Sequence, residues 1–257
     1  MITLYDNKST LPLSHPYCGY SPYVWRIRFA LRFKGLAYRT HWLEYPDVET
    51  IAKSIGAPPT GKRPNGTVRY TIPIIHDSVT NKVISGSFDI IEYLDATYPD
   101  TVQLIPKETR LLQKVFEEAE PGLIIRHLIP VVGSRLHKSP LITPRNQEFM
   151  NSEAGRASYP PPVVYSEEQE KEAWEKFKNS ALGDMAKQML DSEEAPFVMG
   201  KKVSMADAVL FGRFACLRLL WDESTKEWKE MMSWHGGRWG RLFEAYESLP
   251  QVEKYDG

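Results

Sequence analysis

The stretch over residues 21–31, Ser-Pro-Tyr-Val-Trp-Arg-Ile-Arg-Phe-Ala-Leu, limits the possible folds of this chain more than any other. Ser21 is a residue type that caps helices well, because its hydroxyl can pair with a backbone N–H that the first turn leaves unsatisfied. Pro22 suits the first helical position, where its missing N–H is not needed and its fixed φ is already helical. Apolar side chains then follow at helical spacing, at Val24, Ile27 and Leu31. The stretch therefore predicts a helix that begins at Ser21.

The segment before this helix predicts a strand followed by a loop. Residues 2–5 alternate in the manner of a short strand, and the next stretch contains the turn-forming residues Pro12, Pro16 and Gly19. Ser21 is then expected at the positive end of a helix dipole, where a thiolate or another anion is stabilised. An ordinary helix cap without a ligand is the alternative interpretation.

The composition is that of an ordinary globular protein, with 42% hydrophobic and 25% charged residues among 257. The formal net charge of −1 gives no electrostatic reason to expect nucleic acid or an anionic membrane as a partner. The start of the chain lacks the basic and apolar regions of a signal peptide, and no apolar run is long enough to span a bilayer. Two cysteines, Cys18 and Cys216, imply no disulfide framework. These features predict a cytoplasmic protein.

A second strand and a basic loop are expected after the first helix. Gly35 is placed to end that helix, and residues 38–43 predict the strand. The stretch over residues 51–69 is rich in proline and glycine, which indicates a loop. The loop carries four cations, Lys53, Lys62, Arg63 and Arg69.

The next short apolar strand, residues 70–77, has a proline inside it. Pro73 cannot donate to a sheet ladder, so it must lie at an edge, at a bulge, at a strand start or after a cis bond. We expect a cis bond, which would leave the backbone of Ile72 facing a ligand rather than a neighbouring strand. A hairpin is predicted to end near residue 85, and Ser87 is expected to cap the helix that follows.

Strand, helix, strand, loop, hairpin and helix within 98 residues resemble the thioredoxin-fold domain of a glutathione transferase. Ser21-Pro22 stands where that family places its thiol-activating residue. Ile72-Pro73, followed by Ile74, resembles the family's Val-cisPro-x-Leu signature. Ser87 resembles the serine of its Glu/Asp-Ser motif, which binds the γ-glutamyl carboxylate of glutathione.

Within the family, residues 2–6, 21–26 and 92–95 look most like the β-etherase-like branch and its fungal members. One position departs from the pattern, because Gly86 stands where an acidic residue usually precedes the serine. The partner of the glutathione α-amine must then come from elsewhere, from Asp89 or from the other subunit of a dimer.

The second half of the chain predicts a helical domain. Ser204 and Asp207 have the spacing of a capping box, and in glutathione transferases such a box caps the central buried helix of the second domain. Several prolines over residues 135–165 indicate a long surface insertion. The expected fold is an α/β thioredoxin-like domain followed by an all-α domain. The predicted boundaries are 1–99 for the first domain, 100–108 for the linker and 109–257 for the second domain.

The resemblance implies that glutathione is the co-substrate and that Ser21 activates its thiol. A free thiol has a pKa of about 8.5, so only a small fraction is ionised at neutral pH. A hydroxyl donor at a helix N-terminus favours the thiolate, and comparable sites lower thiol pKa values to about 3.5–7.5. Ser21 would thus act as a hydrogen-bond donor and not as a nucleophile.

Other segments are expected to hold the rest of the tripeptide. The backbone at Ile72 and Pro73 would pair with the cysteinyl residue, and Gly86 with Ser87 would hold the γ-glutamyl carboxylate at a helix N-terminus. The glycyl carboxylate requires a cation, for which Lys62 and Arg63 are the first candidates, with Lys53 and Arg69 as alternatives. A solvated basic loop is the alternative interpretation of these four residues.

The second substrate is expected to be a hydrophobic aromatic or phenolic compound. Its pocket is predicted to be formed by Tyr23, Phe116 and His127, because the helices around residues 116–127 directly follow the linker. Conjugation in detoxification, β-etherase-like cleavage and peroxidase activity are all compatible with the resemblance. A homodimer is the family's usual assembly.

Three other hypotheses remain at this stage. The fold can serve as a non-catalytic carrier of hydrophobic ligands, or as an interaction module with a degenerate site. Cys18 and Ser21 also have the Cys-x-x-Ser spacing of a monothiol glutaredoxin, which would make the protein a thiol–disulfide oxidoreductase. Cys18, however, precedes the expected helix start by three residues and loses most of the dipole's effect. No metal is expected, because no second pair completes the metal-like spacing of His15 and Cys18.

Overall fold

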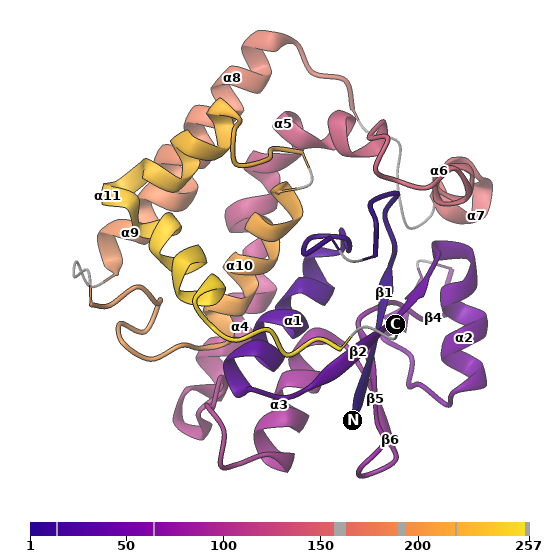
Figure 1. Ribbon diagram of the computed structural model, residues 1–257. Helices are drawn as coiled ribbons and strands as arrows, with labels where there is room; N and C mark the ends of the chain where they lie inside the picture. Colours follow the sequence, from indigo (N-terminus) through magenta and orange to yellow (C-terminus); the bar gives the residue numbers. More distant parts are fainter. Residues whose placement is uncertain (14, 64, 157–162, 190–193, 219, 255–257) are drawn as a thin grey trace.

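Figure 1 shows the protein as a computed structural model, which describes all residues except 14, 64, 157–162, 190–193, 219 and 255–257. A small mixed sheet with its helices, built from the first part of the chain, lies beside a larger group of helices from the second part (Figure 1). The predicted class, an α/β domain joined to a helical domain, is confirmed.

The first part contains a four-stranded sheet in the order β2-β1-β5-β6 and a separate hairpin of β3 and β4. Its elements are β1 (Ile2–Asn7), α1 (Pro22–Lys34), β2 (Tyr38–Leu43), η1 (Tyr45–Asp47), α2 (Val48–Ser54), β3 (Gly61–Lys62), β4 (Val68–Arg69), β5 (Ile74–Asp77), β6 (Lys82–Ser85) and α3 (Ser87–Thr97). Strand β1 runs parallel to β2 and antiparallel to β5. Ile75 pairs with Leu4, and both side chains are fully buried at the centre of the sheet.

The start of α1 has the predicted geometry. Ser21 has extended backbone angles, and its Oγ accepts a hydrogen bond from the Val24 N–H at 3.4 Å. Gly35 ends the helix with a left-handed φ of 65°, a conformation that costs glycine little. The local sequence is therefore sufficient to explain where this helix begins and ends.

The peptide bond between Ile72 and Pro73 is cis, as predicted. The Pro73 carbonyl accepts a hydrogen bond from the Gly86 N–H at 3.1 Å, so the start of β5 lies beside the start of α3. The cap of α3 differs from the prediction, because Gly86 with φ 92° occupies the N-cap position and Ser87 is the first helical residue. A left-handed φ favours glycine at this position, which leaves Ser87 to interact through its side chain with other elements.

Helices dominate the rest of the chain. They are η2 (Lys107–Thr109), α4 (Arg110–Glu120), η3 (Pro121–Ile125), α5 (Arg126–His137), α6 (Pro144–Asn151), α7 (Glu153–Arg156), α8 (Glu167–Lys176), η4 (Phe177–Gly183), α9 (Asp184–Gln188), α10 (Met205–Leu217) and α11 (Lys226–Glu247). The predicted capping box starts α10, where Asp207 Oδ2 accepts a hydrogen bond from the Ser204 N–H at 2.8 Å. No helix of the described residues is long and apolar enough to cross a membrane.

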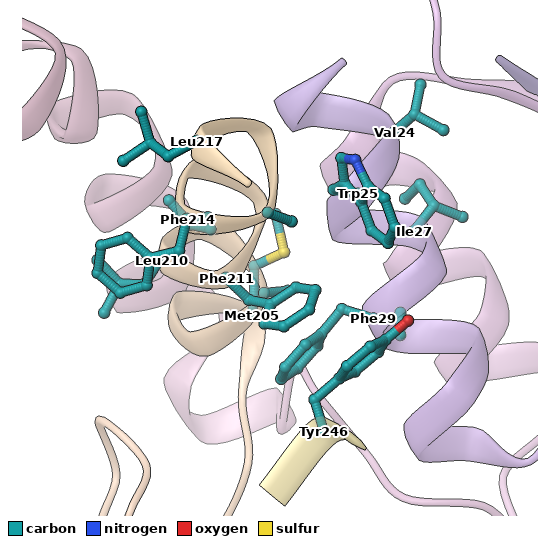
Figure 2. Close-up of a cluster of buried hydrophobic side chains, with 14 of the residues drawn as sticks. Val24, Trp25, Ile27, Phe29, Met205, Leu210, Phe211, Phe214, Leu217 and Tyr246 are labelled. Carbon is teal, nitrogen blue, oxygen red and sulfur yellow. The ribbon is translucent and has the colours of Figure 1, made fainter. Parts of the chain in front are cut away.

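Helices α10 and α1 pack against each other and join the two parts of the protein (Figure 2). Phe211 of α10 contacts Phe29 of α1 with ring centroids 5.1 Å apart and Tyr246 of α11 with centroids 4.2 Å apart. Burial of each large apolar side chain stabilises such an interface by about 1.5–3 kcal/mol. Helix α1 therefore lies in a shared core that fixes its position relative to both parts.

After α11 the chain returns to the sheet and pairs with the outer strand β2. The N–H and C=O groups of Tyr38 form hydrogen bonds with residues 252 and 254, at 3.3 and 2.7 Å. Glu253 Oε2 lies 2.7 Å from Arg28 Nη1, and Arg28 Nη2 lies 3.1 Å from Asp6 Oδ2. Strand β1, helix α1, strand β2 and the C-terminal segment thus share one buried ion network.

Candidate functional site

A cavity of about 1570 Å³ opens where α1, the β3–β4 hairpin, the cis peptide bond and the start of α3 meet. Of the residues predicted to bind glutathione, only the alternative cation Lys53 does not line this cavity, and Tyr23 and the other alternative cation, Arg69, line it as well. The lining residues also include Ser21, Lys62, Arg63, Ile72, Pro73, Gly86 and Ser87. Segments far apart in the sequence therefore converge on one site.

Ser21 is positioned as a hydrogen-bond donor to the cavity. Its side chain lines the cavity wall, and its oxygen already accepts the Val24 N–H. Among the described residues, none accepts a hydrogen bond from the Ser21 hydroxyl, so its hydrogen can point to an anion in the cavity. The positive end of the α1 dipole adds a positive electrostatic potential at this point.

Ser87 is tied to the helical part of the protein. Its hydroxyl donates to Glu117 Oε1 of α4 at 2.8 Å and accepts a hydrogen bond from Arg26 Nη1 of α1 at 3.4 Å. Glu117 lines the cavity and has a side chain that is only 12% exposed. The predicted γ-glutamyl site therefore contains a carboxylate from helix α4 of the helical part.

Behind this position lies a cluster of buried charges. Arg26 contacts Glu117 at 3.1 Å and Glu120 at 3.4 Å, and Glu120 also pairs with Arg213 of α10 at 2.7 Å. The side chains of Arg26 and Glu120 are 1% and 0% exposed. Arg213 Nη2 also donates to the hydroxyl of Tyr23 at 3.2 Å. Paired charges at this depth hold α1, α4 and α10 in fixed positions, because separating any pair would leave an uncompensated buried charge.

Sequence reasoning missed this cluster, although Arg26 lies outside the apolar positions Val24, Ile27 and Leu31 of α1. Glu117 and Glu120 lie three residues apart and therefore share one face of α4. This polar face is directed inward, whereas Leu111, Leu112 and Val115 of the same helix are 72%, 68% and 52% exposed. The sequence shows that α4 has one polar and one apolar face. The usual assumption that the apolar face is buried assigns the wrong face to the interior.

The four candidate cations differ in their surroundings. Arg63 forms an ion pair with Glu49 at 2.7 Å and donates a hydrogen bond to the Val68 carbonyl at 2.6 Å. Lys53 forms an ion pair with the same Glu49 at 2.8 Å. Hydrogen bonds from these two cations lower the pKa of the Glu49 carboxyl, and the hydrogen bond from Lys53 has the larger effect. Arg69 lines the cavity, and its buried Nε has no hydrogen-bond partner among the described residues. Lys62 lines the cavity as an exposed side chain.

The aromatic wall of the cavity comes from an unexpected segment. Tyr45 of η1 and Phe149 of α6 both line the cavity, and their rings stack with centroids 6.5 Å apart. Asn146 of α6 accepts a hydrogen bond from the Tyr45 N–H at 2.7 Å and donates to the Tyr20 hydroxyl at 2.9 Å. Helix α6 and the start of α7, which belong to the predicted surface insertion over residues 135–165, thus line one side of the site. Residues 157–162 of that insertion lie outside the described residues.

Two predicted pocket residues lie elsewhere. Neither Phe116 nor His127 is among the described residues that line the cavity, although Tyr23 is. Phe116 is half-buried against the apolar core, and His127 Nε2 accepts a hydrogen bond from Arg126 Nε at 3.0 Å. Helix α4 instead faces the cavity with Lys114 and Glu117.

Cys18 is buried in the loop before α1. Its Sγ lies 3.7 Å from the Leu11 carbonyl and 3.9 Å from the Ser9 hydroxyl, and it does not line the cavity. Burial raises the pKa of this thiol, which disfavours the reactive thiolate. Within the described part of the chain, no group of three histidine, cysteine, aspartate or glutamate side chains could hold a metal ion.

Comparison with known proteins agrees with this architecture. The family model for the glutathione S-transferase N-terminal domain matches residues 20–97, and the model for the C-terminal domain matches residues 112–249. The glutathione S-transferase-like protein ustS of Aspergillus flavus is 36% identical over 101 residues. That match covers 37% of this chain and only 35% of the Aspergillus protein.

Two crystal structures are similar over nearly the whole chain. Glutathione transferase GSTFuA3 from Phanerochaete chrysosporium is 32% identical, with a TM-score of 0.82 and 98% of each chain covered. The glutathione S-transferase CsGST63524 of Ceriporiopsis subvermispora, in complex with glutathione, is 36% identical, with a TM-score of 0.79 and coverage of 97% of this chain and 99% of that one. The C-terminal family model covers more than half of this chain, and the two crystallised relatives match nearly all of it. The chain therefore belongs to the glutathione S-transferase family.

Proposed function

We propose that the protein is a glutathione transferase that binds glutathione along the cavity and activates its thiol with the Ser21 hydroxyl. The observation that carries this proposal is the convergence of Ser21, the cis peptide bond at Pro73 and Ser87 on one cavity. The related Ceriporiopsis enzyme, crystallised with glutathione, supports the choice of co-substrate.

In this proposal Ser21 stabilises the thiolate rather than forming a bond to the substrate. Its hydroxyl hydrogen and the N-terminus of α1 both favour a negative charge on the glutathione sulfur. Lowering the thiol pKa by two units corresponds to about 2.7 kcal/mol of selective stabilisation of the thiolate. The thiol proton passes to solvent, the sulfur forms a bond to an electrophilic carbon, and the leaving group departs with the bonding electrons.

The ends of the tripeptide would be held by different segments. Ile72 lines the cavity, and its backbone would pair with the cysteinyl backbone, while Ser87 and the start of α3 would bind the γ-glutamyl carboxylate. For the glycyl carboxylate we favour Arg69 over Arg63, because Arg63 is already paired with Glu49.

The second ligand is proposed to be an aromatic or phenolic compound that lies against Tyr45 and Phe149. Both rings face the same cavity as Ser21, and offset or edge contacts between aromatic rings add to the gain from area burial. Conjugation, aryl-ether cleavage and hydroperoxide reduction are three activities that the same thiolate supports. Ligand carriage without turnover is the alternative function, and Tyr45 with Phe149 would serve it equally well.

The test is a comparison of Ser21→Ala with Cys18→Ser in assays with an electrophilic aromatic substrate, an aryl ether and a hydroperoxide. We expect Ser21→Ala to lower kcat/KM by about tenfold or more, which corresponds to at least 1.4 kcal/mol of lost thiolate stabilisation. Cys18→Ser should retain most of the activity. The opposite ranking would assign the protein to the thiol–disulfide oxidoreductases, and binding of phenols without any turnover would make it a carrier.

We also propose a homodimer in a reducing compartment. The outward face of α4 presents Leu111, Leu112 and Val115, an arrangement that a second copy of the chain would cover. Cys18 and Cys216 are both free and buried, which supports the predicted cytoplasmic location.

A further inference from the structure

The position before Ser87 lacks a carboxylate. Gly86 has no side chain, and its φ of 92° is a conformation that other residues adopt only with strain. Glutathione carries an α-ammonium next to its α-carboxylate, and an ammonium enclosed in a protein cavity needs an acceptor to compensate its desolvation. The described residues near Gly86 that line the cavity include two carboxylates, Asp89 and Glu117.

Glu117 is the carboxylate that is coupled directly to Ser87. The Ser87 hydroxyl donates its hydrogen to Glu117 Oε1 at 2.8 Å, so this hydrogen does not point to the cavity. A ligand carboxylate can receive the hydrogen only if the hydroxyl turns away from Glu117. That rotation leaves Glu117 Oε1 with the Arg26 guanidinium at 3.1 Å and with room for another donor.

We propose, on the basis of the function proposed above, that Glu117 of α4 binds the α-ammonium of glutathione. The α-carboxylate of the ligand accepts the Ser87 hydrogen, and the α-ammonium donates to Glu117 in return. One hydrogen bond within the protein is thereby exchanged for two with the ligand. The exchange makes the site selective for a zwitterion, because a carboxylate without the adjacent ammonium would take the Ser87 hydrogen from Glu117 and give it no hydrogen bond in return.

Asp89 is the weaker candidate for this role. Its side chain is exposed, and among the described residues it forms no hydrogen bond with Ser87. Its Oδ2 lies 3.6 Å from the position that a Cβ would take at Gly86, which keeps it near the site. Charge pairs at exposed positions contribute about 0–1 kcal/mol, whereas Glu117 is shielded from solvent and held by Arg26.

Lys114 competes with the ligand in this arrangement. Its ammonium lies 3.0 Å from Glu117 Oε2 and 3.6 Å from Glu118 Oε1, and its side chain is 38% exposed. Removing this ammonium should make Glu117 more attractive to the α-ammonium of the ligand. The proposal therefore predicts opposite effects for two substitutions on the same helix.

The experiment compares the dissociation constants of glutathione and of an analogue in which hydrogen replaces the α-amino group, measured by calorimetry. In the unmodified protein we expect glutathione to bind about 10- to 100-fold more tightly, the range expected for a hydrogen bond between charged groups. Glu117→Gln should bring this ratio close to one, chiefly by weakening glutathione. Lys114→Met should raise it. Glu92→Gln is the matched control, because it removes an exposed carboxylate of α3 that pairs with Arg110 outside the cavity and should leave the ratio unchanged.

Each outcome decides one of the two proposals. A ratio unchanged in Glu117→Gln but abolished in Asp89→Asn would assign the ammonium to Asp89 and overturn this inference. A ratio near one in the unmodified protein would overturn it as well. If glutathione itself did not bind, the proposed function would fail, independently of Glu117. Because both ligands are measured on the same variant, a general loss of folding would affect both and could not imitate the expected change in ratio.

Discussion

Gly212 of α10 lies against Pro22 at the start of α1, so closely that a Cβ at position 212 would stand 2.3 Å from the Pro22 carbonyl oxygen. The helical domain thus contacts the backbone directly beside Ser21. The position of the Ser21 hydroxyl is therefore set by packing between the two domains as well as by the local cap.

Gly212→Ala is expected to destabilise the protein and to impair the site. The added methyl must displace backbone, and overpacking of this kind costs about 1–3 kcal/mol. Chemical denaturation should show the loss, and kcat/KM should fall because Ser21 moves with Pro22. Gly122→Ala is the control, since nothing lies within 4 Å of the corresponding Cβ. A neutral Gly212→Ala would show that the two helices separate easily.

Arg69→Leu is expected to weaken glutathione binding by about tenfold, the loss of one charge-assisted contact. The affinity for γ-glutamylcysteine, which lacks the glycyl residue, should change little. Calorimetry with the two ligands separates the glycyl contact from all others. Arg63→Leu and Lys62→Leu serve as comparisons, and a larger effect of either would assign the glycyl carboxylate to that residue.

Replacing Leu111 and Leu112 together by glutamate should convert a dimer into monomers. Two charges on the outward face of α4 would make its burial against a second copy unfavourable. Sedimentation velocity over a range of concentrations measures the change. Val79→Glu, at a position 74% exposed in the turn between β5 and β6, should leave the assembly intact. An unmodified protein that sediments as a monomer would contradict the proposed dimer.

Glu253→Gln should lower the free energy of unfolding by about 3 kcal/mol at pH 7, as for a broken buried ion pair. Burial alone would raise the pKa of the Glu253 carboxyl, but the Arg28 guanidinium and hydrogen bonds from Thr40 and Tyr38 lower it below 4.5. A lowered native pKa stabilises the fold above pH 4.5, and this contribution is lost as the pH falls through the native pKa. The stability difference between the two proteins should therefore shrink in acid.

Urea titrations at pH 7 and at pH 4 measure this difference. Glu244→Gln is the control, because Glu244 is an exposed residue of α11. An equal loss of stability at both pH values would show that the charge of Glu253 is not what stabilises the C-terminal segment.

Features encoded in short segments were predictable from the sequence. The start of α1 at Ser21, its end at Gly35 and the cis bond at Pro73 each depend on the conformational preferences of one or two residues. The fold class followed from the order of such segments together with the family resemblance.

The parts of the site that depend on distant contacts were not predictable in this way. Arg26 and Glu117 are 91 positions apart, and no local pattern indicates that they meet. The stack of Tyr45 on Phe149 likewise requires the insertion to fold back over η1. Gly86 replaced the expected serine cap because a positive φ was needed there, a requirement that only the backbone path reveals.

The pairing of the C-terminal segment with β2 has a consequence for biosynthesis. Arg28 and Tyr38 receive Glu253 as a partner only after all the helices up to α11 have been translated. Until then, a nascent thioredoxin-like domain outside the ribosome would expose an unpaired sheet edge and an incompletely neutralised arginine. Final consolidation of the first domain must therefore await synthesis of the segment that follows α11.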